Sequence, residues 1–202
     1  ISELKQIIAS HPDLCGLNVT IPYKKEVLDF LDEQSSAVQS IGACNCIKIS
    51  NGKLSGHNTD VIGFETSLRP FLKPEHSAAL ILGTGGAAAA VAYVLEQLKI
   101  SYLSVSRQKG SNTITYQDID QNIMDTHTLI VNTTPLGMYP SVDEYPPLPY
   151  ECMTSKHHCY DLIYNPAETS FLKKAAAHHA TVQNGAEMLI IQAEESWRIW
   201  NE

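Results

Sequence analysis

The chain has 202 residues, 44% of them hydrophobic and 18% charged, which predicts a protein with a packed core. Its formal net charge of −8, without any block of like charges, argues against general binding to nucleic acid or to an anionic membrane. Five scattered cysteines, no signal-like segment and a longest apolar run (residues 87–95) too short for a bilayer predict a cytoplasmic protein.

The first 72 residues combine helical and strand patterns. Apolar residues at helical spacing predict helices, and alternation of apolar and polar residues predicts strands. By these criteria we expect helices near 4–10, 24–31 and 60–68 and strands at 16–21, 44–50 and 53–58. Asn51 and Gly52 join the last two strands, and this pair is typical of the type I′ turn of a β-hairpin.

After the segment PFLKP, residues 70–74, the composition changes and strands alternate with helices. Strands are expected at 78–83, 101–106, 126–134 and 157–164, and helices at 85–98, from about 169, and at 187–200. Residues 139–151 hold four of the ten prolines and are predicted to be a loop. The sequence therefore predicts an α/β protein of two domains, which are residues 1–72 joined by the C-terminal helix 186–202, and residues 73–185 as a Rossmann-type, doubly wound parallel sheet.

A glycine-rich turn follows the first strand of the second domain. In LILGTGGAAAAV the strand meets Gly83-Thr84-Gly85-Gly86, and a helix begins at once. Glycines allow a tight turn and let the backbone approach a pyrophosphate, which the helix N-terminus favours, and Ala88 is small enough for the third glycine position of this pattern. We expect a dinucleotide site, and the alternative is a glycine turn without a ligand.

The end of the next strand indicates which dinucleotide would bind. NAD sites carry an acidic residue there, which binds the ribose 2′-hydroxyl. This strand ends instead in Ser106, Arg107, Gln108 and Lys109. Arg107 can bind a 2′-phosphate, with Ser106 and Lys109 adding to it, and this favours NADP. The alternative is a solvated basic turn.

Two charged residues of the first domain are candidates for proton transfer. Lys24 opens a predicted helix after Pro22, where the helix dipole disfavours a cation and would ease release of its proton. Asp60 can orient such a lysine, but it also opens a helix, where aspartate is a favoured N-cap. Lys25 is the weaker candidate because Asp29, at i+4, offers it a surface partner.

Three further groupings have both functional and structural interpretations. Asn18 and Thr20 share one face of a predicted strand, which suits a polyol substrate or a solvent-exposed edge. A helical stripe is expected to pack against the core and consists of Leu189, Ala193, Trp197 and Trp200. The following residues lack the spacing of a zinc finger, and no metal is expected: Cys152, His157, His158 and Cys159.

Seven motifs together resemble the shikimate dehydrogenase family. They are GLNVTIPYK, IGACNCI, GHNTDVIGF, ILGTGGAAAAV, VNTTPLGM, YDLIYNP and NGAEMLIIQAEESW. They span nearly the whole chain in the order and spacing of the family, and NVTIPYK with NTDxxG is far more specific than the glycine turn. The resemblance implies NADP-dependent reduction of 3-dehydroshikimate to shikimate in aromatic amino acid biosynthesis, with the first domain binding substrate.

The resemblance also implies roles for individual residues. Lys24 and Asp60 would be the catalytic pair. Substrate would be bound by Asn18, Thr20, Asn45, Tyr164 and Gln192. The cofactor would be bound by Gly83, Gly85, Gly86, Ala87, Ser106, Arg107, Asn132, Thr133, Met138 and Gly185.

One family feature is absent from the sequence. Members of the family begin with a β-α-β segment that carries a Ser-x-Ser motif for the substrate carboxylate, and this chain starts at Ile1 without it. We therefore expect the first domain to be incomplete. The alternatives are a quinate/shikimate dehydrogenase that uses NAD, and a nucleotide-binding module without catalysis. The assembly is expected to be a monomer or a homodimer.

Overall fold

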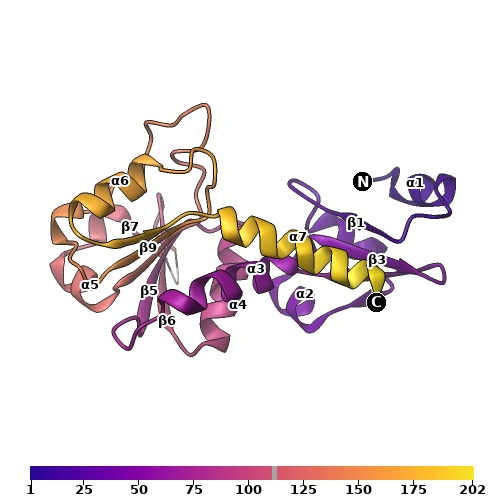
Figure 1. Cartoon of the computed structure of the whole chain (residues 1–202), viewed down its shortest axis with the longest axis horizontal. Coiled ribbons are helices and arrows are strands. Elements are labelled where there is room, and N and C mark those ends of the chain that lie inside the picture. The colour runs from indigo at the N-terminus through magenta and orange to yellow at the C-terminus, as the bar shows by residue number, and fades with distance from the viewer. Residues whose placement is uncertain (111–112) are drawn as a thin grey trace.

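The structure is a computed structural model that describes residues 1–110 and 113–202. It contains two separate β-sheets, one of four strands and one of six. Figure 1 shows them at opposite ends of an elongated molecule, with helices α3 (Thr59–Leu68) and α7 (Ala186–Asn201) between them. The predicted α/β class is confirmed.

The smaller sheet is mixed and has the strand order β1-β3-β4-β2. Its strands are β1 (Gly16–Asn18), β2 (Glu33–Gln34), β3 (Cys46–Ser50) and β4 (Lys53–His57). The predicted hairpin is confirmed, because β3 pairs antiparallel with β4 and both Asn51 and Gly52 have positive φ, 51° and 77°. Val27, Val38 and Ile47, the last of them in β3, are fully buried and pack in one hydrophobic cluster with Leu4 of α1 (Leu4–Ser10).

Two predictions in this region are wrong. The strand expected over 16–21 ends at Asn18, which forms the last register pair of β1 with β3, opposite Cys46. The chain then turns, with the Tyr23 N–H donating to the Thr20 carbonyl. The helix expected from Lys24 is a 3₁₀ helix that begins only at Glu26 (η1, Glu26–Phe30).

Helix α2 (Ser36–Ile41) was not predicted from the sequence. It is six residues long and depends on its ends. The Ser35 hydroxyl accepts the Val38 N–H at 3.4 Å, and Gly42 closes the helix in the left-handed conformation at φ 69°.

The larger sheet is wholly parallel and has the strand order β10-β9-β8-β5-β6-β7. Its strands are β5 (Ala78–Leu82), β6 (Ser101–Ser106), β7 (Thr113–Thr115), β8 (Leu129–Asn132), β9 (His158–Asp161) and β10 (Thr181–Gln183). Successive strands lie on both sides of β5, with β6 and β7 on one side and β8, β9 and β10 on the other. This order confirms the doubly wound topology and places the switch point between β5 and β8. The short edge strands β7 and β10 were not predicted.

Helices cover both faces of this sheet. Alternate residues of β5 face opposite sides: Ile81 packs with α3 and α4 (Gly86–Gln97), and Leu80 packs with α5 (Gln121–Thr126) and α6 (Ser170–Ala177). The remaining helical turns are the 3₁₀ segments η2 (Arg69–Phe71), η3 (Tyr116–Asp118) and η4 (Tyr150–Cys152).

Helix α7 packs closely on α3 and reaches back to the small sheet. A Cβ built on Gly63 would meet the Met188 carbonyl oxygen at 2.7 Å, so the two helix backbones are nearly in contact there. Trp200 donates its Nε1–H to the Ile47 carbonyl at 3.0 Å. The predicted packing stripe is otherwise wrong, because Trp197 is 67% exposed and Leu189 41%. No helix among the described residues is both long and apolar enough to cross a bilayer.

Candidate active site

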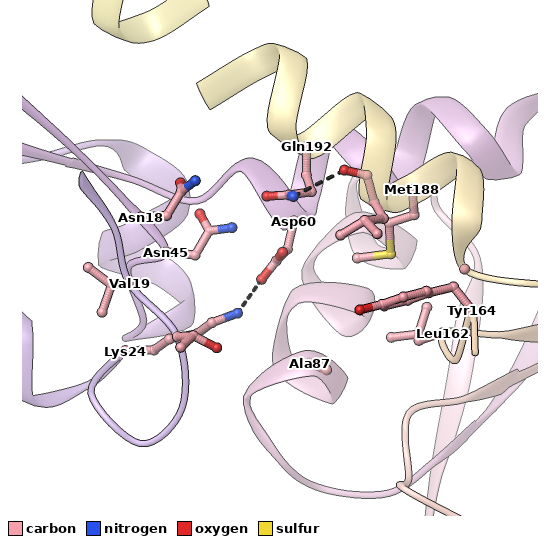
Figure 2. A pocket seen from close by; sticks show the side chains of 13 residues that line it. Asn18, Val19, Lys24, Asn45, Asp60, Ala87, Leu162, Tyr164, Met188 and Gln192 are labelled. Atoms are coloured by element: carbon pink, nitrogen blue, oxygen red, sulfur yellow. Dashed lines mark hydrogen bonds and ion pairs between the residues drawn. The ribbon is translucent and has the colours of Figure 1, made fainter. Parts of the chain in front are cut away.

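A pocket of about 350 Å³ lies between the two sheets. Figure 2 shows it bounded by the segment after β1, the start of α3, the loop after β9 and the inner face of α7. All seven residues predicted for catalysis and substrate binding line it: Asn18, Thr20, Lys24, Asn45, Asp60, Tyr164 and Gln192.

Lys24 and Asp60 form an ion pair inside this pocket. The lysine Nζ lies 2.7 Å from Asp60 Oδ2, and their side chains are 25% and 18% exposed. The Cys44 N–H donates to the Lys24 carbonyl at 2.8 Å and so fixes the lysine backbone beside the hairpin. Because no α-helix begins at Lys24, the helix-dipole argument for its proton release does not apply.

Asp60 is not the N-cap of its helix. Asn58 occupies that position, and its side chain donates instead to the Ala43 carbonyl at 3.0 Å. The first N–H of α3, from Thr59, is bound by Asn45 Oδ1 at 2.7 Å. The Asp60 carboxylate is therefore left free of capping and faces Lys24 (Figure 2).

A buried hydroxyl joins the hairpin, α3 and α7 behind the pocket. Thr59 Oγ1 accepts from Asn45 Nδ2 at 3.1 Å and lies 3.1 Å from the Ser196 hydroxyl and 3.4 Å from Gln192 Oε1. Ser196 in turn donates to the Gln192 carbonyl at 2.9 Å. The network positions both Asn45 and Gln192. Thr59 and Ser196 were missed from the sequence, although Thr59 directly precedes Asp60.

The remaining wall of the pocket is open to solvent. Asn18 and Thr20 are exposed, and Tyr164, from the loop after β9, is 52% exposed. In Figure 2 Tyr164 lies across the pocket from Lys24. Cys44, whose N–H binds the Lys24 carbonyl, is buried, and this burial raises its thiol pKa to about 11. The thiol therefore stays protonated at neutral pH and is a poor nucleophile.

A second pocket of about 330 Å³ lies over the glycine-rich turn. It is lined by five of the ten residues predicted for cofactor binding, Gly83, Gly85, Ser106, Arg107 and Thr133. Gly83 needs its small size, because its φ is +110° and a Cβ would meet Thr133 Oγ1 at 2.7 Å. At Gly85 and Gly86 a Cβ would meet no atom of residues 1–110 or 113–202 within 4 Å, so space among these residues lies open above the start of α4. This shape fits a pyrophosphate at a helix N-terminus.

The other five predicted cofactor residues are placed differently. Ala87 and Gly185 line the first pocket, so they lie where a cofactor reaching from the turn would meet the substrate. Gly86, Asn132 and Met138 line neither pocket. Asn132 is fully buried and bonded to its neighbours, and Met138 is 49% exposed. Tyr116, which the sequence did not single out, lines the second pocket beside Arg107.

Two of the residues at the basic end of β6, Ser106 and Lys109, make contacts with neighbouring residues. The Ser106 hydroxyl donates to the Gln108 carbonyl at 2.6 Å and accepts the Gln108 N–H at 3.1 Å. Lys109 lies 3.8 Å from Asp118. Arg107 is exposed at the pocket, and none of the ion pairs among residues 1–110 and 113–202 involves it.

The cysteines and histidines around β9 do not converge on one point. His157 Nε2 contacts the Met124 carbonyl at 3.1 Å, and His158 Nε2 contacts Gln183 Oε1 at 3.2 Å. In the part of the chain that the structure describes, no three His, Cys, Asp or Glu side chains are grouped to hold a metal ion.

Comparison with known proteins gives consistent matches. The family model "Shikimate dehydrogenase substrate binding domain" matches residues 1–47. The chain is 34% identical to the shikimate dehydrogenase (NADP(+)) of Methanosphaera stadtmanae, over 99% of this chain and 77% of that protein. It is similar to the structure of a chorismate mutase/shikimate 5-dehydrogenase fusion protein from Clostridium acetobutylicum, with a TM-score of 0.88, 37% identity, and 99% and 76% of the two chains covered.

A second similar structure is that of a quinate dehydrogenase from Corynebacterium glutamicum in complex with NAD, with a TM-score of 0.85 and 28% identity, over 98% of this chain and 77% of that one.

Proposed function

This chain belongs to the shikimate dehydrogenase family, and on that premise we propose that it catalyses the reversible NADP-dependent reduction of 3-dehydroshikimate to shikimate. The observation that carries the proposal is the ion pair of Lys24 and Asp60, 2.7 Å apart, in a pocket that also contains Ala87 and Gly185. A proton donor thus lies beside the place where a cofactor bound on the glycine-rich turn would end.

Lys24 would act as the acid. Bound NADPH supplies the hydride that reduces the C3 carbonyl carbon of the substrate. The carbonyl oxygen gains negative charge as this happens, and the Lys24 ammonium group stabilises that charge and donates one proton to it. Asp60, through its 2.7 Å contact, holds the ammonium group in place. In the reverse direction neutral Lys24 accepts the proton of the hydroxyl.

Five polar side chains around the pair would bind the substrate ring. They are Asn18, Thr20, Asn45, Tyr164 and Gln192. They come from four separate parts of the fold, so they can contact hydroxyl groups on different sides of one small ring. The Thr59 network supports this assignment because it fixes the side chain of Asn45 and the backbone of Gln192 before any ligand arrives.

The second pocket would hold the nucleotide part of NADP. The turn from Gly83 to Gly86 would contact the pyrophosphate, and Ser106 and Arg107 the 2′-phosphate, since no acidic residue ends β6. The complete proposed set is Gly83, Gly85, Gly86, Ala87, Ser106, Arg107, Asn132, Thr133, Met138 and Gly185. Asn132 would act through the contacts of its buried side chain, without touching the cofactor.

We also propose that each sheet belongs to a functional domain. Residues 1–72 with helix 186–202 would bind the substrate, and residues 73–185 the cofactor. The position of the first pocket between the two sheets supports this division.

The proposal is tested with purified protein and four ligand combinations. Reduction of the cofactor is followed at 340 nm. Each of the two substrates, shikimate and quinate, is combined with NADP⁺ and with NAD⁺. We expect shikimate with NADP⁺ to give the highest kcat/KM. A higher kcat/KM with quinate and NAD⁺ would favour the second candidate, a quinate dehydrogenase, which the similarity to the C. glutamicum structure supports and Arg107 argues against.

A further inference from the structure

Asp161 is a fully buried carboxylate at the end of β9. Within residues 1–110 and 113–202 none of the ion pairs includes it. It accepts three hydrogen bonds instead, from Asn132 Nδ2 at 3.0 Å, the Ile163 N–H at 3.1 Å and the Thr169 hydroxyl at 2.6 Å. Burying a charge without a cation costs free energy. Packing alone therefore does not explain why a carboxylate occupies this position.

Hydrogen bonds connect Asp161 to the nucleotide pocket, which is the second pocket. Asn132 is its register partner on β8 and donates to Asp161 Oδ1. The Asn132 amide oxygen accepts both the N–H and the hydroxyl of Thr134, at 3.0 and 2.6 Å. Thr134 lines the second pocket. The carboxylate therefore fixes, through one side chain, the loop that forms part of the nucleotide site.

The same carboxylate oxygen is also connected by hydrogen bonds to residues of the first pocket. Asp161 Oδ1 accepts the Ile163 N–H, and the Leu162 N–H donates to the Asn132 carbonyl at 3.0 Å. Leu162 and Tyr164, on either side of Ile163, line the first pocket. These bonds hold the loop after β9 in the position that presents both side chains.

The connection continues into α7. The Ile163 carbonyl accepts the N–H of Gly185, the residue before this helix, at 3.1 Å. The contact is close, because a Cβ on Gly185 would overlap the Leu162 carbonyl oxygen. Helix α7 carries Gln192 into the first pocket.

We propose that Asp161 is a positioning residue that holds the nucleotide pocket and the substrate pocket in one fixed arrangement, although it contacts neither ligand. This rests on the proposed function, in which one ligand occupies each pocket. Hydride transfer needs the two reacting carbons at a fixed short separation and orientation. A single buried carboxylate bonded to both loops provides that relationship from within the sheet.

Three substitutions separate this role from a contribution to stability. Asp161→Ala removes all three bonds. Asp161→Asn keeps an oxygen for the two donors that serve the pockets, Asn132 and Ile163. Thr169→Val removes the third bond, on the α6 side, together with the bond from the Leu172 N–H to the Thr169 hydroxyl that caps α6, and changes no residue that lines either pocket. Thermal melting shows first that each variant is folded.

Calorimetric titration of NADP⁺ and of shikimate gives the two Kd values without requiring turnover. In Asp161→Ala we expect both Kd values to rise about tenfold, the effect of losing hydrogen bonds to a charged group. Asp161→Asn should stay within about threefold of the wild type for both ligands, and Thr169→Val should lower Tm with both Kd values unchanged. If Asp161→Ala does not fold, Asp161→Ser replaces it with the same expected joint rise.

The inference is overturned if Asp161→Ala lowers Tm but leaves either Kd at the wild-type value. It is also overturned if Thr169→Val raises the Kd values of both ligands by the same factor. These outcomes are distinct from failure of the proposed function, in which the wild-type protein itself would not bind shikimate or NADP⁺.

Discussion

Lys24 Nζ lies 2.7 Å from Asp60 Oδ2, and the two residues come from different segments of the small-sheet half of the molecule, a turn after β1 and the first turn of α3. Both side chains remain in contact with solvent in the pocket, at 25% and 18% exposure. Ion pairs that retain solvent contact contribute about 0–1 kcal/mol to stability. The pair is therefore expected to matter more for turnover than for folding.

Lys24→Met should remove the proton donor and leave the fold intact. We expect kcat to fall by about 10²–10⁴, the usual contribution of a general acid, with Tm changed by only a few degrees. Lys25→Met is the matched control, because Lys25 is adjacent and exposed and does not line the pocket. Equal kcat values for Lys24→Met and Lys25→Met would remove Lys24 from the mechanism.

Asp60→Asn tests whether the carboxylate serves catalysis or the helix. An asparagine can still hydrogen-bond the lysine but leaves its charge uncompensated, so kcat should fall by about 10- to 100-fold with little loss of Tm. A variant that lost Tm and kept its kcat would show that Asp60 acts as a helix-end residue. The Asn45–Thr59 bond at 2.7 Å already satisfies the first N–H of α3 and makes that outcome unexpected.

The parts of this fold that were predictable are those in which local pattern and tertiary position agree. Strands β5, β8 and β9 are almost wholly buried, and β5 and β8 are wholly or mainly apolar. Asn51-Gly52 determines its own turn conformation. Strands β7 and β10 were not predictable, since Thr113–Thr115 and Thr181–Gln183 are short and polar and are strands only because a neighbour pairs with them.

The site shows a similar division. Lys24, Asp60 and the turn residues Gly83 and Gly85, all of which line one of the two pockets, were chosen as candidates because their residue types are informative in sequence. The reasoning for Lys24 was wrong in its physics, because a turn and a 3₁₀ helix replace the expected α-helix. Thr59, Ser196 and Asp161 were missed because a hydroxyl or carboxylate gains significance only from partners far away in the chain.

Arg107→Ala should weaken the binding of NADP⁺ and leave the binding of NAD⁺ unchanged. Arg107 is exposed at the second pocket, and in the proposed function its guanidinium would bind the 2′-phosphate. We expect KM for NADP⁺ to rise about 10- to 100-fold, the effect of losing charge-assisted hydrogen bonds. NAD⁺ has no 2′-phosphate and is the internal control, so its KM should not change. A parallel rise in both KM values would show that Arg107 contacts the adenine or the pyrophosphate instead.

Gly63→Ala should destabilise the protein although it replaces glycine inside a helix. Alanine gains about 1 kcal/mol in helix propensity. The new Cβ would meet the Met188 carbonyl oxygen at 2.7 Å and Gln192 Cβ at 3.2 Å, forcing α3 and α7 apart at a cost of about 1–3 kcal/mol. We expect a lower Tm and, because Gln192 moves, a higher KM for shikimate. Thr66→Ala, at an exposed site on α3, should leave Tm equal or raised.

Asp161 should make stability depend on pH between about 4 and 6. Burial raises its pKa to about 6 from an ordinary value of 3.8. Its folded pKa lies above its unfolded one, so its stabilising contribution is complete below 3.8 and is lost as pH rises through 6. The change is on the order of 2–3 kcal/mol. Asp161→Asn lacks this contribution. The Tm of the variant minus the Tm of the wild type should therefore be highest at pH 7 and fall steadily toward pH 4.

His158 provides the opposite control for that measurement. Burial lowers its pKa to about 4 from 6.5, so its contribution to stability is complete above 6.5 and is lost as pH falls toward 4. The Tm of His158→Leu relative to the wild type should therefore rise as pH is lowered over the same range. Melting curves of the three proteins at pH 4 to 8 check both signs. A Tm difference between Asp161→Asn and the wild type that stayed constant over this range would mean that Asp161 does not titrate there.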